Sequence, residues 1–238
     1  MPGSTARDGT IKNANTTCLN GRPFRADLER ALGRAIAFEN DANLFALAEA
    51  RLGAGREHAS GVVFGVILGT GVGGGVVCRG RLWAGRMGVA GEWGHHTVWA
   101  GRPDARGCYC GQRGCVEAHL SGPALEARYA ELAGQRLPLA EIVAGRAEDP
   151  HAGAVVEEML ATFGRGLANV VDVLDPTAIV LGGGLSNLGL LYDEGRERVA
   201  ALTFTDTFDT PIVRAACGDS AGVLGAALLA VDRVTPGA

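Results

Sequence analysis

The chain has 238 residues, of which 47% are hydrophobic and 20% charged, and its formal net charge is −4. This length is sufficient to bury a core in one large domain or in two lobes. The acidic balance argues against nucleic-acid binding, which needs a basic face. No apolar run long enough to cross a membrane and no charged-then-apolar leader is present, so we expect a cytoplasmic protein without membrane contact.

The expected elements alternate between helix and apolar strand along the chain. The longest predicted helix covers 149–175, because Asp149 is a suitable cap and Pro150 is favoured in a first turn. Arg79-Gly80 predicts the turn of a hairpin over 74–85. The other expected helices cover 25–33, 42–55, 121–134, 191–203 and 220–233, and the other expected strands cover 34–41, 61–69, 177–184 and 210–217. This order implies an α/β fold with a mixed, partly parallel sheet.

Two glycine-rich turns follow apolar strands. The first reads LGTGVGGG (68–75), where bare backbone N–H groups are suited to a phosphate and Thr70 adds a hydroxyl donor. The same letters are equally compatible with a tight hairpin between core strands. The second reads LGGGLS (181–186) and leaves room for the base or ribose of a nucleotide, although many strand-to-helix turns look like this.

A polar pair marks the predicted start of the helix over 42–55. Asn40 and Asp41 stand where a strand ends, which is where α/β folds tend to bind ligands. Either residue is a suitable helix N-cap, and capping is the commoner role for such an aspartate. The spacing alone therefore leaves Asp41 open as a cap or as a functional carboxylate.

Three of the six cysteines are clustered in CYCGQRGC (108–115). Three thiolates and one imidazole form a closed tetrahedral set, which is typical of structural zinc, so we favour a metal site over free buried thiols. The fourth ligand is His95 or His96, and position alone does not choose between them. His119 is expected at a helix start on the surface. Glu92 and Glu117 flank the cluster and are suited to accept sugar hydroxyls, although a lone glutamate is usually a surface residue.

Taken together, these motifs resemble the ROK family (repressors, open reading frames and kinases) of the sugar kinase/Hsp70/actin superfamily. The resemblance covers nearly the whole chain, and its most specific part is the cysteine motif with the glutamate that follows it. NANTTCLNGRPF (13–24) and Trp93 look most like the bacterial fructokinase branch. The motifs that carry the resemblance to the ROK family are NDAN (40–43), LGTGVGGG (68–75), GEWGH (91–95), CYCGQRGCVE (108–117) and VLGGGLS (180–186).

The resemblance implies a two-lobed, ribonuclease H-like fold and ATP-dependent phosphorylation of a hexose. Fructose is expected first, followed by mannose, glucose or an N-acetylhexosamine. Asp41 would be the general base, and the substrate-binding residues would be Asn40, Asp41, Glu92, His95 and Glu117. Zinc would be bound by His95, Cys108, Cys110 and Cys115, which selects His95 over His96. ATP with Mg²⁺ would contact Gly69, Thr70, Gly71, Val72, Gly73, Gly74, Gly75, Val76 and Val77 around its phosphates, and Gly182, Gly183 and Gly184 beside its adenosine. The resemblance also implies a homodimer.

One departure from the family concerns the first phosphate motif, Asp-x-Gly-Gly-Thr, which this sequence lacks. Cys18 also stands where the fructokinase branch more often has a tryptophan. We therefore expect a shortened first lobe, consisting of 1–60 with the closing helix 220–238 packed on it, beside a second lobe over 61–219, and a reduced kinase activity. A truncated gene model, a fragment or a degenerate paralogue would explain this. The alternatives are a non-enzymatic ROK sugar sensor, disfavoured because no helix-turn-helix precedes the kinase-like part, and an inactive zinc-containing sugar-binding module.

Overall fold

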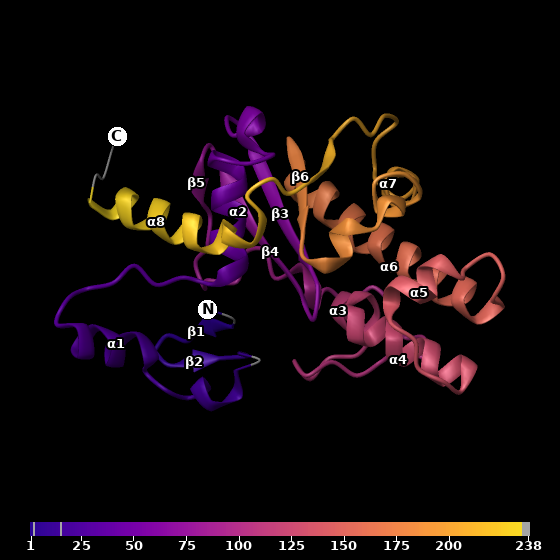
Figure 1. The fold of residues 1–238 in the computed structure, drawn as a ribbon. Coiled ribbons are helices and arrows are strands. Elements are labelled where there is room, and N and C mark those ends of the chain that lie inside the picture. Colours follow the sequence, from indigo (N-terminus) through magenta and orange to yellow (C-terminus); the bar gives the residue numbers. More distant parts are fainter. Residues whose placement is uncertain (2, 15, 235–238) are drawn as a thin grey trace.

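A five-stranded mixed sheet forms the centre of the protein (Figure 1). This computed structural model describes residues 1, 3–14 and 16–234. The strand order is β5-β4-β3-β6-β7; β3 pairs antiparallel with β4 and parallel with β6, and β7 is parallel to β6. The predicted α/β class with a mixed, partly parallel sheet is therefore confirmed. The strands are β3 (Val62–Leu68), β4 (Val72–Cys78), β5 (Arg81–Leu82), β6 (Ala178–Gly182) and β7 (Ile212–Arg214).

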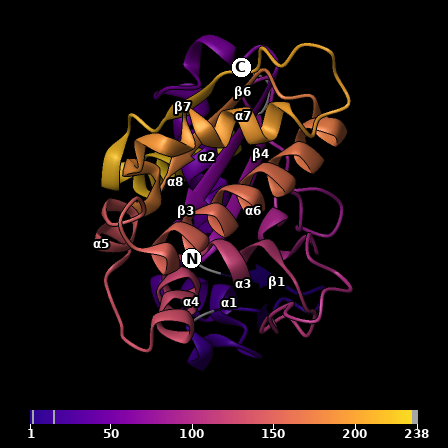
Figure 2. The ribbon, with the colours of Figure 1, turned by 90° about the vertical axis from the view of Figure 1, so that its right-hand side faces the viewer.

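Helices cover both faces of this sheet (Figures 1 and 2). On one face, α2 (Asp41–Arg51) and α8 (Ala221–Val234) enclose a small core that includes Ala46, Val63 and Val180. On the other face lies the larger core, around the long helix α6. The helices on that side are α3 (Val116–Leu120), α4 (Gly122–Ala133), α5 (Leu139–Ala144), α6 (Pro150–Leu174) and α7 (Glu194–Ala200). Among the described residues, no helix combines the length and the apolar character that a membrane span requires.

Local signals explain where several elements begin and end. Asp149 caps α6 by accepting a hydrogen bond from the backbone N–H of His151, and Pro150 is the first residue of that helix. Arg79 and Gly80 have φ angles of 51° and 71°, which are the left-handed values that a two-residue hairpin turn needs. The predicted hairpin between β4 and β5 and the predicted long helix are both confirmed.

The N-terminal segment forms a small separate layer, at the lower left of Figure 1. It contains the short hairpin of β1 (Ser4–Thr5) and β2 (Ile11–Lys12) and the helix α1 (Phe24–Leu32), which ends at Gly33 as expected. The predicted strand over 34–41 is wrong. Residues 34–40 have no strand assignment, and among the described residues no strand pairs with them. The apolar residues of this segment do not form a strand, because the described part of the chain offers no neighbouring strand for backbone hydrogen bonds.

Helix α8 packs along α2, and α2 lies on β3 and β4 of the five-stranded sheet. The approach is so close that a side chain at Gly225 would collide with the carbonyl oxygen of Leu44. The last four positions of the expected closing helix, 235–238, lie outside the described residues. The division of the chain into a first lobe, made of 1–60 with the closing helix 220–238, and a second lobe over 61–219 stays a prediction.

A buried carboxylate holds this layer to the segment that precedes α8. Glu49, on α2, has no exposed surface, and its oxygens accept hydrogen bonds from the backbone N–H groups of Ala54, Ala216 and Cys217 at 2.7–3.0 Å. Burial, reinforced by the Glu49 charge, raises the pKa of the Cys217 thiol to about 11. The carboxylate therefore joins two segments that are far apart in the sequence.

Removing this carboxylate is expected to destabilise the fold strongly. Glu49→Ala leaves three backbone N–H groups without their partner, and each unsatisfied buried group costs about 1–3 kcal/mol. We expect the free energy of unfolding to fall by about 3 kcal/mol or more, measured by urea denaturation. Glu57→Ala is the matched control, because Glu57 is an exposed glutamate, and it should change stability by about 0.5 kcal/mol or less. Equal effects of the two substitutions would contradict this role for Glu49.

Candidate functional site

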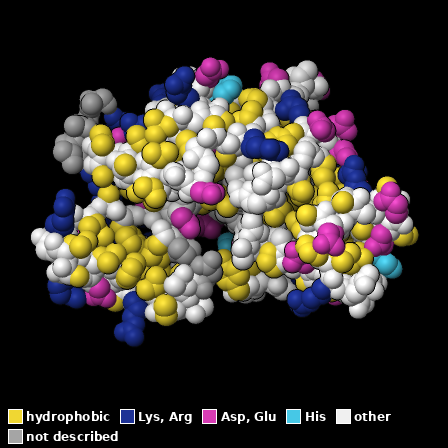
Figure 3. Space-filling view, viewed as in Figure 1, with side chains coloured by type: hydrophobic (Ala, Val, Ile, Leu, Met, Phe, Trp, Pro, Cys, Tyr) yellow, Lys and Arg dark blue, Asp and Glu magenta, His cyan; other side chains and the backbone are white. Residues whose placement is uncertain are grey.

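A cavity of about 820 Å³ lies between the N-terminal layer and the rest of the protein. Figure 3 shows a hollow there, with acidic side chains and a histidine at its edge. Its wall is built from β1–β2, the start of α2, the turn between β3 and β4, the segment before α3, and α3 itself. The five predicted substrate-binding residues all line it, namely Asn40, Asp41, Glu92, His95 and Glu117.

The start of α2 separates the roles of Asn40 and Asp41. Asn40 is the N-cap: its side-chain oxygen accepts from the N–H groups of Ala42 and Asn43 at 2.8 and 3.3 Å, and its amide donates to the carbonyl oxygen of Gly3 at 2.8 Å. The helix therefore does not depend on Asp41 for its cap. The Asp41 carboxylate is exposed on the cavity wall, where it can meet a ligand.

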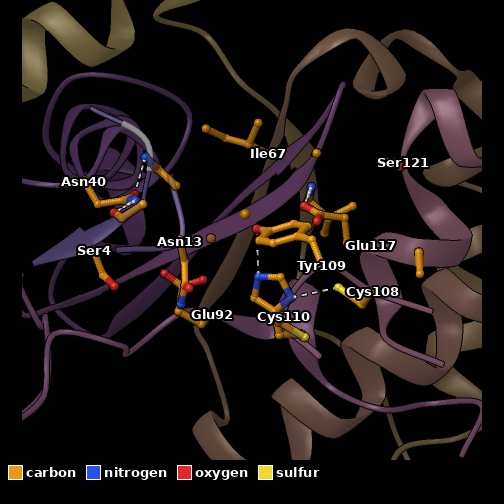
Figure 4. Close-up of a pocket in the computed structure, with 18 of the residues that line it drawn as sticks. Ser4, Asn13, Asn40, Ile67, Glu92, Cys108, Tyr109, Cys110, Glu117 and Ser121 are labelled. Atoms are coloured by element: carbon orange, nitrogen blue, oxygen red, sulfur yellow. Dashed lines mark hydrogen bonds between the residues drawn. The ribbon is translucent and has the colours of Figure 1, made fainter. Parts of the chain in front are cut away.

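Glu92 also lines the cavity (Figure 4). Burial raises its pKa, and the charges of Glu117 and Asp41 act in the same direction, against the opposing effects of His95 and Lys12. Three carboxylates thus face one space. Carboxylates in such a site can accept hydrogen bonds from the hydroxyl groups of a polyol.

Four side chains form a candidate metal site beside the cavity. The ligand atoms of His95, Cys108, Cys110 and Cys115 all lie within 4.8 Å of one another. Cys110 Sγ and Cys115 Sγ are 3.7 Å apart, and Cys108 Sγ is 3.6 Å from His95 Nδ1. A tetrahedral zinc ion separates two sulfur ligands by about 3.8 Å, and sulfur from nitrogen by about 3.6 Å. The donor set and these two separations therefore fit zinc, with His95 rather than His96 in the group.

The buried end of this cluster is Cys115. Burial raises the pKa of its thiol to about 12, which favours the neutral thiol unless a cation offsets the cost. The loop that carries the cluster is closed by two backbone hydrogen bonds, from Cys108 to Gln112 at 2.8 Å and from Gly111 to Cys108 at 3.0 Å. The backbone hydrogen bonds of the loop thus help to hold the candidate ligands close together.

Glu117, in the first turn of α3, connects this helix to the first glycine turn. Its Oε2 accepts a hydrogen bond from the N–H of Val72 at 2.8 Å. A side chain at Gly71 would approach this carboxylate to 2.7 Å and would push the end of the Glu117 side chain away from the turn. Glu117 therefore fixes the turn and also faces the cavity.

The predicted nucleotide contacts divide into turn and strand. Gly69, Thr70 and Gly71 form the turn between β3 and β4 and are partly or well exposed. Val72, Gly73, Gly74, Gly75, Val76 and Val77 belong to β4. Val76 and Val77 are 4% and 0% exposed, on opposite faces of the sheet, which leaves little surface for a nucleotide. We therefore narrow the predicted phosphate contacts to the turn and the first residues of β4.

The second glycine turn follows β6. Gly182 is buried, and a side chain there would collide with the Phe45 ring. Gly183 has a φ of 82°, a value that favours glycine, and Gly184 is exposed with open space around it. Gly183 and Gly184 are thus the members of this group that a nucleotide can reach.

His119 corrects one sequence expectation. It is 4% exposed rather than on the surface, and its Nδ1 lies 2.8 Å from Glu158 Oε1 on α6. Its other ring nitrogen accepts from the backbone N–H of Arg106 at 3.3 Å. His119 therefore links the segment before the cysteine cluster to the core, which nothing in its local sequence reveals.

Several cavity residues were not singled out from the sequence. Lys12, the only lysine of the chain, lies in the cavity wall. Tyr109 occupies the variable position between two motif cysteines, and Ser121 is a buried residue next to the first glycine turn. The cavity is consequently richer in polar groups than the motifs alone suggest.

The comparisons with known proteins decide the family. The model of the ROK family matches residues 1–233. The chain belongs to the ROK family. It is 40% identical to the N-acetyl-D-glucosamine kinase of Vibrio cholerae, in an alignment that covers 96% of this chain and 78% of that protein.

Solved ROK structures share the fold. The ROK hexokinase from Thermus thermophilus matches with a TM-score of 0.83 and 36% identity, over 99% of this chain and 78% of that one. A ROK glucokinase from Streptomyces griseus, solved with glucose and AMPPNP, matches with a TM-score of 0.76 and 32% identity, over 95% and 78%. The α/β fold of ROK sugar kinases is thereby confirmed for this chain.

Proposed function

We propose that this ROK protein transfers the γ-phosphate of ATP to the primary hydroxyl group of a hexose. The observation that supports it most is the convergence of Asp41, Glu92, His95 and Glu117 on one cavity that also contains the first glycine turn. A single carboxylate at a helix start is an ordinary cap, but here Asn40 already fills that role. The kinases among its relatives support the same reaction class.

In this proposal Asp41 is the general base. It accepts the proton of the primary hydroxyl as that oxygen attacks phosphorus, and the helix start on which it is held fixes its direction. Glu92, Glu117 and the cavity-facing nitrogen of His95 bind the remaining hydroxyls. Positioning of this kind supplies most of the catalysis in phosphoryl transfer, because the chemistry itself needs little covalent help.

The first glycine turn fits the phosphates of ATP. Its bare N–H groups and the exposed Thr70 hydroxyl are donors beside Asp41 in the same cavity wall, and Gly183 and Gly184 leave open surface for the adenosine. Mg²⁺ bound with ATP supplies charge neutralisation on the phosphate oxygens. Glu117 accepts a hydrogen bond from the N–H of Val72, so this carboxylate would stabilise the conformation of the turn when the phosphates bind.

We also propose that the four-residue cluster binds a structural zinc ion. Its ligand separations support this assignment, and no ligand position is left for substrate because three cysteines and His95 complete a tetrahedron. The zinc would orient the His95 ring and the loop over 108–115, both of which face the sugar.

The preferred hexose is the finer part of the proposal. Fructose is the first candidate, from the resemblance of 13–24 and Trp93 to the fructokinase branch; residue 15 of that stretch lies outside the described residues. Trp93 is 1% exposed and donates to the Gly73 carbonyl at 2.9 Å, so it supports β4 and has no direct contact with substrate. The family resemblance further predicts a homodimer, which analytical ultracentrifugation tests.

A coupled ADP-release assay tests the function. The purified chain with Mg-ATP should phosphorylate at least one of fructose, mannose, glucose and N-acetylglucosamine. The phosphate should be found on the C6 hydroxyl, so that fructose gives fructose 6-phosphate. A version extended at its N-terminus by a strand and an Asp-x-Gly-Gly-Thr turn is the comparison, and its kcat should be higher. If neither version turns over any hexose while sugar binding is detectable, the protein is a sugar sensor or binding module and the kinase proposal is wrong.

A further inference from the structure

Tyr109 projects into the cavity from the loop that carries the cysteine cluster (Figure 4). Its hydroxyl oxygen is 3.1 Å from His95 Nε2, and its ring meets the His95 ring edge-on with centroids 5.2 Å apart. The side chain is 66% exposed, so it is not held there by the core. It therefore occupies space that a ligand of the cavity would share.

The contacts of His95 explain why this position matters. His95 Nδ1 faces Cys108 Sγ, so the cluster uses that nitrogen. The nitrogen left for a sugar is Nε2, and it is the one that Tyr109 contacts. Any hydroxyl that binds His95 must consequently lie against the tyrosine or displace it.

The loop limits how far Tyr109 can withdraw. The residues on either side of it, Cys108 and Cys110, both belong to the four-residue cluster. The backbone N–H of Cys108 is also bonded to the Gln112 carbonyl at 2.8 Å. With the proposed zinc bound to both neighbours, the tyrosine would rotate about its own side-chain bonds while its backbone stayed in the cavity wall.

Hexose geometry determines which part of the sugar meets Tyr109. In an aldohexopyranose the primary hydroxyl is on the carbon attached to C5, and C2 stands across the ring from C5. In Figure 4, Asn40, the neighbour of Asp41, lies on one side of the cavity, while Tyr109 and Glu117 lie on the other. A sugar with its primary hydroxyl at Asp41 therefore directs its C2 edge toward His95 and Tyr109.

We propose that Tyr109 is a specificity-determining residue that, among aldohexoses, admits a hydroxyl group at C2 and excludes an acetamido group. This inference rests on the proposed function, because it takes Asp41 as the end of the cavity where phosphate is transferred. A C2 hydroxyl can share the hydrogen-bonding space between His95 Nε2 and the tyrosine hydroxyl. An acetamido group is larger by an acetyl unit and would need the volume that the ring fills.

Matched sugar pairs test this proposal directly. Isothermal titration calorimetry on the full chain gives the Kd for glucose and N-acetylglucosamine, and for mannose and N-acetylmannosamine, which differ only at C2. The wild-type protein should bind the hydroxyl sugar at least about 10-fold more tightly in one or both pairs. Y109A should reduce that ratio by about 10-fold or more, and Y109F should preserve it, because the ring is retained.

Q112A is the control, because Gln112 lies in the same loop and also lines the cavity. It should leave the ratio unchanged, and zinc content, measured for every variant, should be equal. A wild-type protein that binds both members of each pair equally, or a Y109A ratio equal to that of the wild type, overturns the proposal. Turnover is scored separately: sugar binding without any ADP release contradicts the kinase function while the Kd ratio still decides the role of Tyr109.

Discussion

Asp41→Asn is expected to lower kcat by about 10²–10⁴-fold for whichever hexose the protein phosphorylates. The amide cannot accept the proton of the attacking hydroxyl, yet it has nearly the same shape. Asn40 provides the cap of α2, so the helix should form as before. Sugar Kd, zinc content and melting temperature should therefore stay close to the wild-type values, and steady-state kinetics beside calorimetry separate the two effects.

The matched control is Asp27→Asn. Asp27 also lies in the first turn of a helix, α1, and is exposed, but it does not line the cavity. Its replacement should leave kcat unchanged. A fully active Asp41→Asn protein would refute the assignment of the base, and a variant that loses sugar binding as well as turnover would make Asp41 a binding residue instead.

Cys110→Ser is expected to release zinc and to weaken sugar binding at the same time. A serine hydroxyl is a poor replacement for a thiolate ligand, and the loss opens the tetrahedron that holds the loop. His95 and Tyr109, which face the sugar, are then free to move, so the sugar Kd should rise by about 10-fold or more. The melting temperature should also fall, by about 2–4 °C for each kcal/mol of stability lost.

Cys18→Ser serves as the control, because Cys18 is an exposed cysteine outside the cluster. Its metal content, measured by atomic absorption, and its melting temperature should match those of the wild-type protein. If Cys110→Ser loses its zinc and yet binds sugar with unchanged affinity, the metal does not order the sugar site and the proposed link between them fails.

The helices and turns that carry their own signals could be predicted from the sequence. The α6 boundaries follow from Asp149 and Pro150 at one end, and the β4–β5 turn follows from Arg79-Gly80. The expected strand over 34–41 failed because a strand depends on a neighbour that local sequence does not specify. The prediction that His119 lies on the surface was wrong for a similar reason, because its partner Glu158 lies 39 residues away in the chain.

For the candidate site, the resemblance to the family predicted which residues belong to the site, but it did not predict how they are arranged in space. The five predicted sugar-binding residues come from three separate motifs, and the fold brings them to one cavity. The roles of residues at the variable positions of the motifs could not be predicted in this way. Tyr109 fills a variable position of the cysteine motif, and only its distance to His95 Nε2 reveals a role.

The packing of α8 along α2 has a consequence for how the protein is made. A ribosome completes Asp41 early, but the helix that begins at this residue packs on Ala221–Val234. Through Glu49 it also binds the N–H groups of Ala216 and Cys217, which lie 167 and 168 residues after Glu49 in the chain. The proposed base therefore reaches its final support only after α8 has been synthesised. A stop codon before α8 would leave α2, and with it the proposed base, without that support.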